Sequence, residues 1–413
     1  MKKIILIVLI TIWVVLVLYS EIFGEEKIAI MNWKDIKNLR WCPDGNSIAF
    51  VATFVKYNPE KENPEKEFYS AGIGKVNIDG LSFQIIASSP WLLFLEIHKE
   101  NDEEITRRQR IKNPEPTGPG GYRDPTPSPK AITPIPLFSQ YTPFEWSSDG
   151  KKIIFAETET VVPPKVDGYI WSINADGTGL RPLLKIDAEH PLELNWSPYL
   201  QRLDNGKIAL RACKRNTNEK VFQCFDPESG RIENRISLGV LWPPEDYILS
   251  PDGKKVLVLK VAKELRGRRG SDDIFVAILG ARDTTNITNS GEIGECLSPV
   301  WSPDSKKIAF EFHPIEETRI SRNYLNSIWV IDADGKNSRP ITPSIKQRNE
   351  IRDEWDGWVK DTQPAWSPDG RKIAFIREYC QRINGKYKYS YSIEVTTIEG
   401  EDQKTVISCV RKE

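Results

Sequence analysis

Histidine is the first residue type to examine for chemistry, because it serves most often in acid–base catalysis and metal binding. The 413 residues include only three histidines, His98, His190 and His313. Their spacing matches no ligand motif, so we expect no metal centre. The segment Asp332-Ala-Asp-Gly335 resembles the start of a calcium loop but lacks the later glutamate. We expect no cofactor, and a calcium ion in a central channel stays open without a motif to support it.

Other enzyme and ligand classes are tested by motif and charge. A hydrolase serine is expected in Gly-x-Ser-x-Gly, which does not occur in this sequence. Lys and Arg total 57 against 58 Asp and Glu, a net charge of -1, so no broad positive field would attract nucleic acid. We expect a protein without nucleic-acid binding, and a binding protein rather than an enzyme.

Tryptophan and arginine concentrate in the centres of protein interfaces. The charged stretch Arg348–Lys360 carries two tryptophans, and Trp242 opens a second segment, Trp-Pro-Pro-Glu-Asp. The alternative is that these tryptophans fill the mouth of a channel or pack between structural units. The candidate partner-binding residues are Trp355, Trp358, Arg352, Asp356, Trp242 and His190.

Six cysteines permit disulfides if the chain is exported. Cys213 and Cys224 flank a polar segment that we expect to lie within one hairpin, so they form the candidate disulfide. Buried free thiols are the alternative. No Cys-x-x-Cys occurs.

These residues must be positioned by a repeat that runs through the chain. Trp301-Ser-Pro-Asp-Ser305 precedes Lys307-Ile-Ala-Phe310, and Trp366-Ser-Pro-Asp-Gly370 precedes Lys372-Ile-Ala-Phe375. Related copies, one of them degenerate, start at residues 41, 146, 196 and 249. The second half of a copy, as in Ile328–Gly335, alternates apolar and polar residues and ends in an Asp-Gly turn.

Each copy therefore predicts four antiparallel strands joined by Pro-Asp-Gly and Asp-Gly turns. One such sheet cannot bury both faces, so six copies predict a ring of six stacked blades. The expected fold class is all-β, a six-bladed β-propeller of four-stranded antiparallel blades with an N-terminal hydrophobic signal or anchor helix.

The repeat residues resemble the repeats of TolB-type six-bladed propellers, also called WD40-like or PD40 repeats. The resemblance runs from about residue 35 to the end and implies the architecture. Members bind partner proteins, precede prolyl-oligopeptidase-type hydrolases, or act as polysaccharide lyases, so it implies no single function. Two departures are expected: no room for the α/β domain that precedes the TolB propeller, and no hydrolase domain after the last repeat.

Variation in loop length is concentrated on one face of the expected ring. The Ser-Pro-Asp-Gly and Asp-Gly turns share the uniform face, whereas the other connections share the opposite, variable-loop face. The longest excess is an insertion at residues 87–140, rich in proline in its second part. The expected blades of the domain 25–413 start near residues 35, 141, 191, 244, 296 and 361.

The N-terminus indicates export. Lys2 and Lys3 precede sixteen residues, Ile4 to Tyr19, without a charge. We interpret residues 1–24 as a cleaved signal peptide or an uncleaved anchor, placing the propeller in the periplasm or at the cell surface. The expected function is an exported scaffold, tethered or free, that binds a protein or peptide partner through the variable-loop face. The alternative is a carbohydrate-active lyase or hydrolase at the channel mouth.

Overall fold

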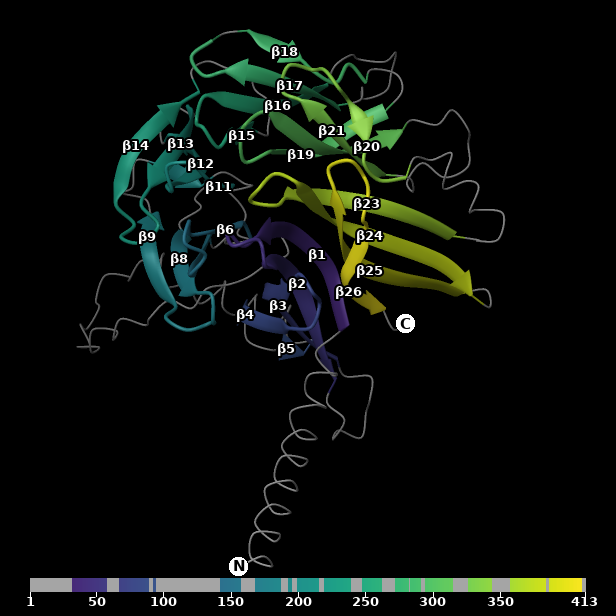
Figure 1. Ribbon diagram of the computed structural model, residues 1–413. Coiled ribbons are helices and arrows are strands. Elements are labelled where there is room, and N and C mark those ends of the chain that lie inside the picture. Colours follow the sequence, from purple (N-terminus) through teal and green to yellow (C-terminus); the bar gives the residue numbers. More distant parts are fainter. Residues whose placement is uncertain are drawn as a thin grey trace, which may run out of the picture. The chain divides into compact units, whose positions relative to one another are not determined.

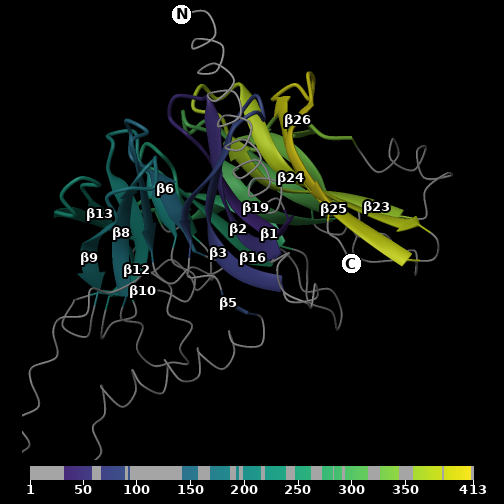
Figure 2. The same cartoon turned by 90° about the horizontal axis from the view of Figure 1, so that it is seen from below.

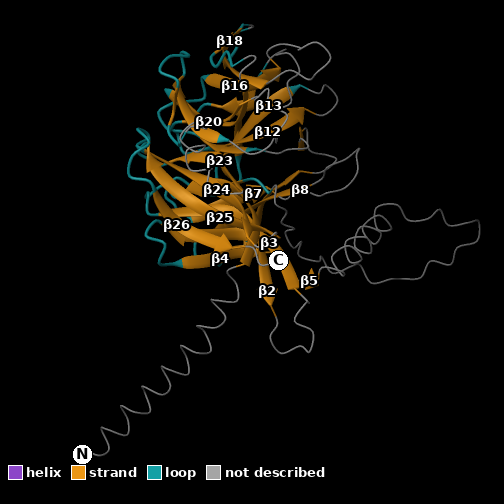
Figure 3. Cartoon of the chain, turned by 90° about the vertical axis from the view of Figure 1, so that its right-hand side faces the viewer, coloured by secondary structure: helices purple, strands orange, loops and turns teal. Residues whose placement is uncertain are grey.

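The structure is a computed structural model that describes most of the repeat region. The described residues are 32–57, 67–88, 92–93, 142–156, 168–186, 192–194, 199–214, 219–238, 247–261, 272–281, 283–290, 294–314, 326–343, 357–383 and 386–410. They form strands and turns and contain no helix (Figure 3). None of these residues lies in a helix that could cross a bilayer. The predicted signal or anchor segment, 1–24, and most of the insertion at 87–140 lie outside them.

The chain is a six-bladed β-propeller with four-stranded antiparallel blades (Figure 1). Blade 1 is formed by β1 (Asn32–Trp41), β2 (Ser47–Tyr57), β3 (Glu67–Asn77) and β4 (Phe83–Ser88). Blade 2 is formed by β6 (Phe144–Trp146), β7 (Lys152–Ala156), β8 (Gly168–Asn174) and β9 (Arg181–Ile186). Blade 3 is formed by β10 (Leu192–Leu194), β11 (Leu200–Arg202), β12 (Ile208–Lys214), β13 (Lys220–Phe225) and β14 (Ile232–Ser237).

The last three blades repeat the same order of strands. Blade 4 is formed by β15 (Tyr247–Leu249), β16 (Lys255–Val261), β17 (Asp272–Ile278) and β18 (Thr284–Asn286). Blade 5 is formed by β19 (Gly294–Trp301), β20 (Lys307–Pro314), β21 (Ser327–Asp332) and β22 (Arg339–Pro340). Blade 6 is formed by β23 (Gly357–Trp366), β24 (Lys372–Ile383), β25 (Lys386–Thr397) and β26 (Lys404–Val410).

The chain divides into two compact units. Unit 1 comprises Met1–Lys34, Thr53–Ser70 and Pro90–Ile132, and unit 2 comprises Asp35–Ala52, Ala71–Ser89 and Thr133–Glu413. Within unit 1, β5 (Leu92–Leu93) pairs antiparallel with β3 at Phe68 and Tyr69. The packing and the site described below belong to unit 2.

Each Ser-x-Asp-Gly turn is held by the side chains that define the repeat. In blade 6, Ser367 Oγ donates to Asp369 Oδ1 at 2.6 Å and accepts from Lys372 N at 2.8 Å. This hydrogen bond from Ser367 holds the pKa of Asp369 below its ordinary value. Gly370 closes the turn with φ 68°, a left-handed conformation that favours glycine. The repeat sequence therefore encodes the hairpin that ends each first strand near the axis.

The hydrophobic core lies between neighbouring blades rather than within one. Between blades 1 and 2, for example, Val51 and Ile73 pack with Trp146, Phe155 and Trp171, all nearly or fully buried. Equivalent clusters join blades 2 to 3, 3 to 4, 4 to 5 and 5 to 6. No blade could bury these faces alone, which is why the repeat requires a ring.

Tryptophans at the ends of first strands link blades by a repeated hydrogen bond. The indole N–H of each donates to a carbonyl on the first strand of the preceding blade. The bonds are Trp41 to Ala365 at 3.1 Å, Trp146 to Arg40 at 3.3 Å, Trp301 to Ile248 at 3.1 Å and Trp366 to Val300 at 3.2 Å. The first of these crosses from blade 1 to blade 6 and so closes the ring. Figure 1 and Figure 2 show β1 beside the strands of blade 6.

The sequence offers two candidates for the strand that closes the ring, Lys27–Met31 and Lys404–Ser408, because either could be the fourth strand of blade 6. The structure places Lys404–Ser408 in β26, which pairs with β25 as the fourth strand of blade 6. Residues 27–31 lie outside the described part. Among the described strands, each blade is built from a continuous stretch of sequence, and no strand is shared across the seam between blades 1 and 6.

Blade 3 departs from the predicted repeat. The prediction placed Trp196 at the end of its first strand, but two short strands, β10 and β11, pair with β12, and β11 ends at Arg202. Arg202 therefore occupies the position that tryptophan holds in four other blades. Trp196 lies outside the described residues.

The predicted disulfide between Cys213 and Cys224 is wrong, because the pairing of β12 with β13 holds the two residues apart. Cys213 lies opposite Lys220, whereas Cys224 lies opposite Ala209. Four residues of β12 separate the two positions, about 13 Å at the usual strand rise. A disulfide requires Cα atoms closer than about 7 Å. Cys224 is a buried free thiol, and burial raises its pKa to about 11.

Candidate functional site

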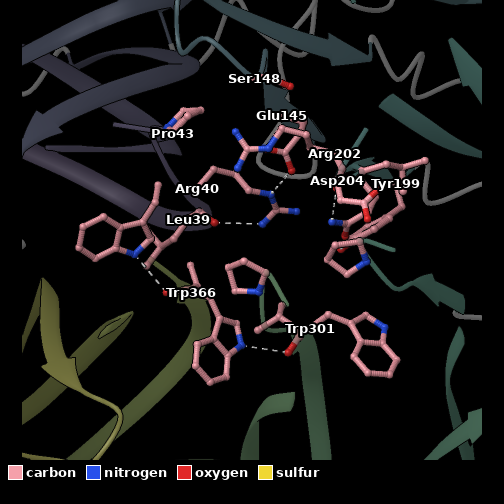
Figure 4. Close-up of a pocket in the computed structure, with 17 residues that line it drawn as sticks. Leu39, Arg40, Pro43, Glu145, Ser148, Tyr199, Arg202, Asp204, Trp301 and Trp366 are labelled. Atoms are coloured by element: carbon pink, nitrogen blue, oxygen red, sulfur yellow. Dashed lines mark hydrogen bonds and ion pairs between the residues drawn. The ribbon is translucent and has the colours of Figure 1, made fainter. Parts of the chain in front are cut away.

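The described part of the propeller contains an axial pocket at the end of the ring where the Ser-Pro-Asp-Gly turns lie (Figure 4). All six blades contribute residues to it, and its volume is about 310 Å³. Small-molecule and peptide side-chain sites begin at about this size. The lining comes from the ends of first strands and from the turns that follow them. The hairpin encoded by each repeat thus also builds the pocket.

The pocket has a polar side and a tryptophan–proline side. Blades 1 to 3 supply the polar side: Arg40, Glu145, Ser148, Tyr199, Gln201, Arg202 and Asp204. The tryptophan–proline side comes mainly from blades 4 to 6: Trp41, Pro251, Trp301, Pro303 and Trp366. Figure 4 shows Arg40, Glu145 and Arg202 close together, facing Trp301 and Trp366. The pocket can therefore contact an apolar body and a charged group at the same time.

Arg40 is fixed by partners on two sides. Its Nε lies 3.3 Å from Glu145 Oε2, and its Nη1 donates to Leu39 O at 3.0 Å. Glu145 is itself held, because its Oε1 accepts from Trp146 N at 3.0 Å. Such partners give the Arg40 guanidinium a single orientation before any ligand arrives, which lowers the entropic cost of binding.

Tyr199 lies between two guanidinium groups. The Arg40 guanidinium carbon is 5.9 Å from the centre of its ring, and that of buried Arg211 is 5.7 Å away. Burial raises the pKa of the Tyr199 phenol. Its hydroxyl donates to Gln201 Oε1 at 3.0 Å. Because burial favours the protonated phenol, the Tyr199 hydroxyl stays a hydrogen-bond donor to Gln201.

The residue immediately before the last residue of each first strand accounts for part of the difference between the two sides of the pocket. This position is Arg40, Glu145 and Gln201 in blades 1 to 3, and Ile248, Val300 and Ala365 in blades 4 to 6. It is polar in the first half of the ring and apolar in the second. This signal is present in the sequence, one residue before the strand-ending tryptophans.

The residues predicted to bind a partner are not tested by the structure. Trp355, Arg352, Asp356, Trp242 and His190 lie outside the described residues. The backbone of Trp358 belongs to β23, where it pairs with Cys380.

His313 lies on β20 opposite Glu295, with Nδ1 3.9 Å from Glu295 Oε2. Convergence of His190 and His313, which the lyase alternative requires, therefore stays a prediction. No cluster of metal-ligating side chains occurs among the described residues.

A buried carboxyl group links blades 5 and 6. Glu311 is 4% exposed, accepts from Gln363 N at 2.8 Å and accepts from Asn326 Nδ2 at 3.3 Å. Gln363 Oε1 in turn accepts from Asn38 N at 2.7 Å, across the seam to blade 1. Gln363 and Asn38 both have positive φ, 53° and 56°, three residues before a strand-ending tryptophan. Ser298, three residues before Trp301, has the same conformation with φ 48°, but the three residue types differ, so the sequence gives no common signal for it.

We expect Glu311 to make stability depend on pH. Burial raises its pKa, although the hydrogen bonds and the charge of Lys360 oppose this shift. The folded state therefore binds this proton more tightly than the unfolded state, and stability is lost as pH rises from about 4.3 through the folded-state pKa. Glu311→Gln should gain stability over the wild type as pH rises from 4 to 8, measured by urea unfolding. A difference that does not change with pH would contradict this, and exposed Glu233→Gln is the control.

Comparison with known proteins finds distant structural similarity to several proteins. No protein-family model matches this sequence, and no curated protein sequence matches it. Among solved structures, a TolB-type protein of Agrobacterium tumefaciens is 19% identical, with TM-score 0.41, covering 65% of this chain and 80% of its own. The propeller domain of the Trilobed protease of Pyrococcus furiosus is 15% identical, with TM-score 0.39, covering 92% and 96%. Oligogalacturonate lyase of Vibrio parahaemolyticus is 11% identical, with TM-score 0.38, covering 84% and 86%.

Proposed function

We propose that this chain is an exported binding protein whose axial pocket takes a peptide segment of a partner protein. The observation that carries the proposal is the pocket itself, which combines fixed arginine donors with nearly buried tryptophans. Tryptophan and arginine contribute strongly at interface centres, where rigid side chains bind at low entropic cost. The Arg40 guanidinium is held by Glu145 and Leu39 before a ligand binds, which suits recognition.

Location and the second contact surface are parts of the same proposal. The charged start and apolar run at residues 1–24 support export, with or without a membrane tether. The tryptophans predicted on the opposite, variable-loop face, Trp355, Trp358 and Trp242, would contact a separate region of the partner. Replacing Trp355 and Trp358 with alanine should weaken partner binding without changing the axial pocket.

The test is selection of binding peptides from a displayed random library, followed by affinity measurement on pocket variants. Ser148 lies at the rim of the pocket and is exposed. Ser148→Trp should block entry and weaken selected peptides by about tenfold or more. The matched control is Ser338→Trp, the same change at an exposed serine of blade 5 that does not line the pocket. Failure to select peptides, or equal affinity for both variants, would contradict the proposal.

A further inference from the structure

Arg202 is the residue by which blade 3 differs from the other blades. Its counterparts Trp41, Trp146, Trp301 and Trp366 each direct an indole N–H to the preceding blade. Arg202 instead places a guanidinium in the axial pocket beside Arg40 (Figure 4). A flexible charged side chain thus replaces a packing residue beside the fixed Arg40–Glu145 pair.

The hydrogen-bonding capacity of Arg202 is not used up within the described residues. Its Nη1 atom is buried and has no hydrogen-bond partner there. A buried donor of this kind destabilises the folded state while it stays unsatisfied. Because Arg202 is only half-buried, its side chain can turn Nη1 towards an acceptor that a ligand supplies in the pocket.

The charges around the pocket favour an anionic acceptor. Two arginines, Arg40 and Arg202, line the pocket against two carboxylates, Glu145 and exposed Asp204, and buried Arg211 adds a third cationic group 5.7 Å from the centre of the Tyr199 ring. Glu145 is already paired with Arg40. Arginine binds carboxylates with short, charge-assisted hydrogen bonds that match its planar shape.

The opposite side of the pocket sets the rest of the ligand. Trp301 and Trp366, which are 6% and 8% exposed, and exposed Pro303 offer a small apolar surface that suits a compact aliphatic or aromatic group. A volume of about 310 Å³ admits one bulky residue and not a folded domain. An apolar body that ends in a carboxylate fits both sides.

We infer that the axial pocket binds a carboxylate attached to an apolar group, with the half-buried Arg202 guanidinium as the principal donor and Arg40 beside it. This inference rests on the proposed function and specifies its ligand. The carboxylate has three sources: the C-terminus of a peptide, an acidic side chain, or a small free acid. All three share the same chemistry at Arg202.

The experiment compares N-acetyl-L-phenylalanine with N-acetyl-L-phenylalaninamide on the full chain, by calorimetry and by tryptophan fluorescence. The two probes differ only in the carboxylate. We expect the acid to bind at least about tenfold more tightly than the amide, because a hydrogen bond to a charged group is worth about 1.5 to 3 kcal/mol. Arg202→Gln should remove this preference. Equal binding of acid and amide, or no binding of the acid, would overturn the inference.

Two further variants separate loss of the site from loss of the fold. Arg202→Trp installs the residue that four blades already carry, so it should preserve the unfolding midpoint while abolishing acid binding. Arg231→Gln removes an exposed arginine of the same blade and should leave acid binding unchanged. If Arg202→Trp still prefers the acid, Arg202 is not the donor and the inference fails.

Selected peptides then identify the source of the carboxylate. Each is tested as a free acid, as a C-terminal amide, and with its acidic side chains replaced by amides. Loss on amidation indicates the C-terminus, and loss on side-chain replacement indicates an acidic residue. If peptides stay sensitive to Ser148→Trp but insensitive to both changes while the acid probe still binds, a small free acid is the source. If the acid probe also shows no preference, the proposed function stands without this inference.

Discussion

Asp361→Ala should destabilise the propeller by about 3 to 5 kcal/mol, because it leaves a charged guanidinium buried without its partner. Arg377 Nε donates to Asp361 Oδ1 at 2.7 Å, and its Nη2 donates to Oδ2 at 2.9 Å. Asp361 is fully buried and Arg377 is 8% exposed. Although burial opposes the charged form, the hydrogen bonds to Asp361 raise the pKa of Arg377 above its ordinary value. The charge therefore cannot be relieved by losing a proton.

The pair also connects two blades, since Asp361 N donates to Asn326 O at 3.0 Å. Urea unfolding measures the effect, and the double variant Asp361→Leu with Arg377→Met tests its cause. Replacing both charges by apolar groups should recover most of the loss. Glu233→Ala, which removes an exposed partner of Lys207, should change the midpoint little. A double variant as unstable as Asp361→Ala would show that shape, not charge, explains the loss.

The architecture was predictable because the repeat encodes it locally. Each Ser-x-Asp-Gly turn is fixed by hydrogen bonds among residues within five positions, such as Ser367, Asp369 and Lys372. Apolar positions at strand spacing then require neighbouring sheets for burial. Six copies of such a unit leave little choice of fold, so the six-bladed propeller predicted from sequence is confirmed.

The pocket was not predicted, because it depends on which residues of distant copies meet at the axis. Arg40 and Glu145 are 105 positions apart, yet the bond between Trp146 and Arg40 O brings their strands together. Arg202 was not predicted because Trp196-Ser-Pro resembles the repeat motif. The end of the first strand of blade 3 was therefore predicted at Trp196, whereas β11 ends at Arg202. In a repeat protein, the residues that depart from the repeat are the first candidates for functional residues.

The seam between blades 1 and 6 should open before the rest of the ring when its tryptophan is removed. Trp41 is 5% exposed and donates to Ala365 O at 3.1 Å. Trp301 is 6% exposed and makes the same bond, also at 3.1 Å, between blades 4 and 5. Replacing either tryptophan by alanine should lower the free energy of unfolding by about 3 to 5 kcal/mol, since both variants lose a buried side chain of the same size.

The two variants should nevertheless differ in how they open. Blades 4 and 5 follow each other in sequence, whereas the described contacts across the seam are noncovalent. At Gly80, an added Cβ would lie 2.2 Å from Val406 O, which shows how closely a turn of blade 1 approaches β26. In hydrogen exchange at low urea concentrations, Trp41→Ala should therefore expose amides of β1, β23 and β26 well below the global unfolding free energy.

Trp301→Ala is the matched control, and its amides should exchange mainly through global unfolding. The same pattern in both variants would mean that the seam is held by more than the described contacts. Residues 27–31 would then be the candidate, because they were predicted to compete for the fourth strand of blade 6. Deleting residues 1–31 from Trp41→Ala would decide between these explanations. An additional loss of amide protection in β26 would support an extra strand formed by residues 27–31. No change would mean that the contacts of Trp41, Asn38 and Gly80 close the ring.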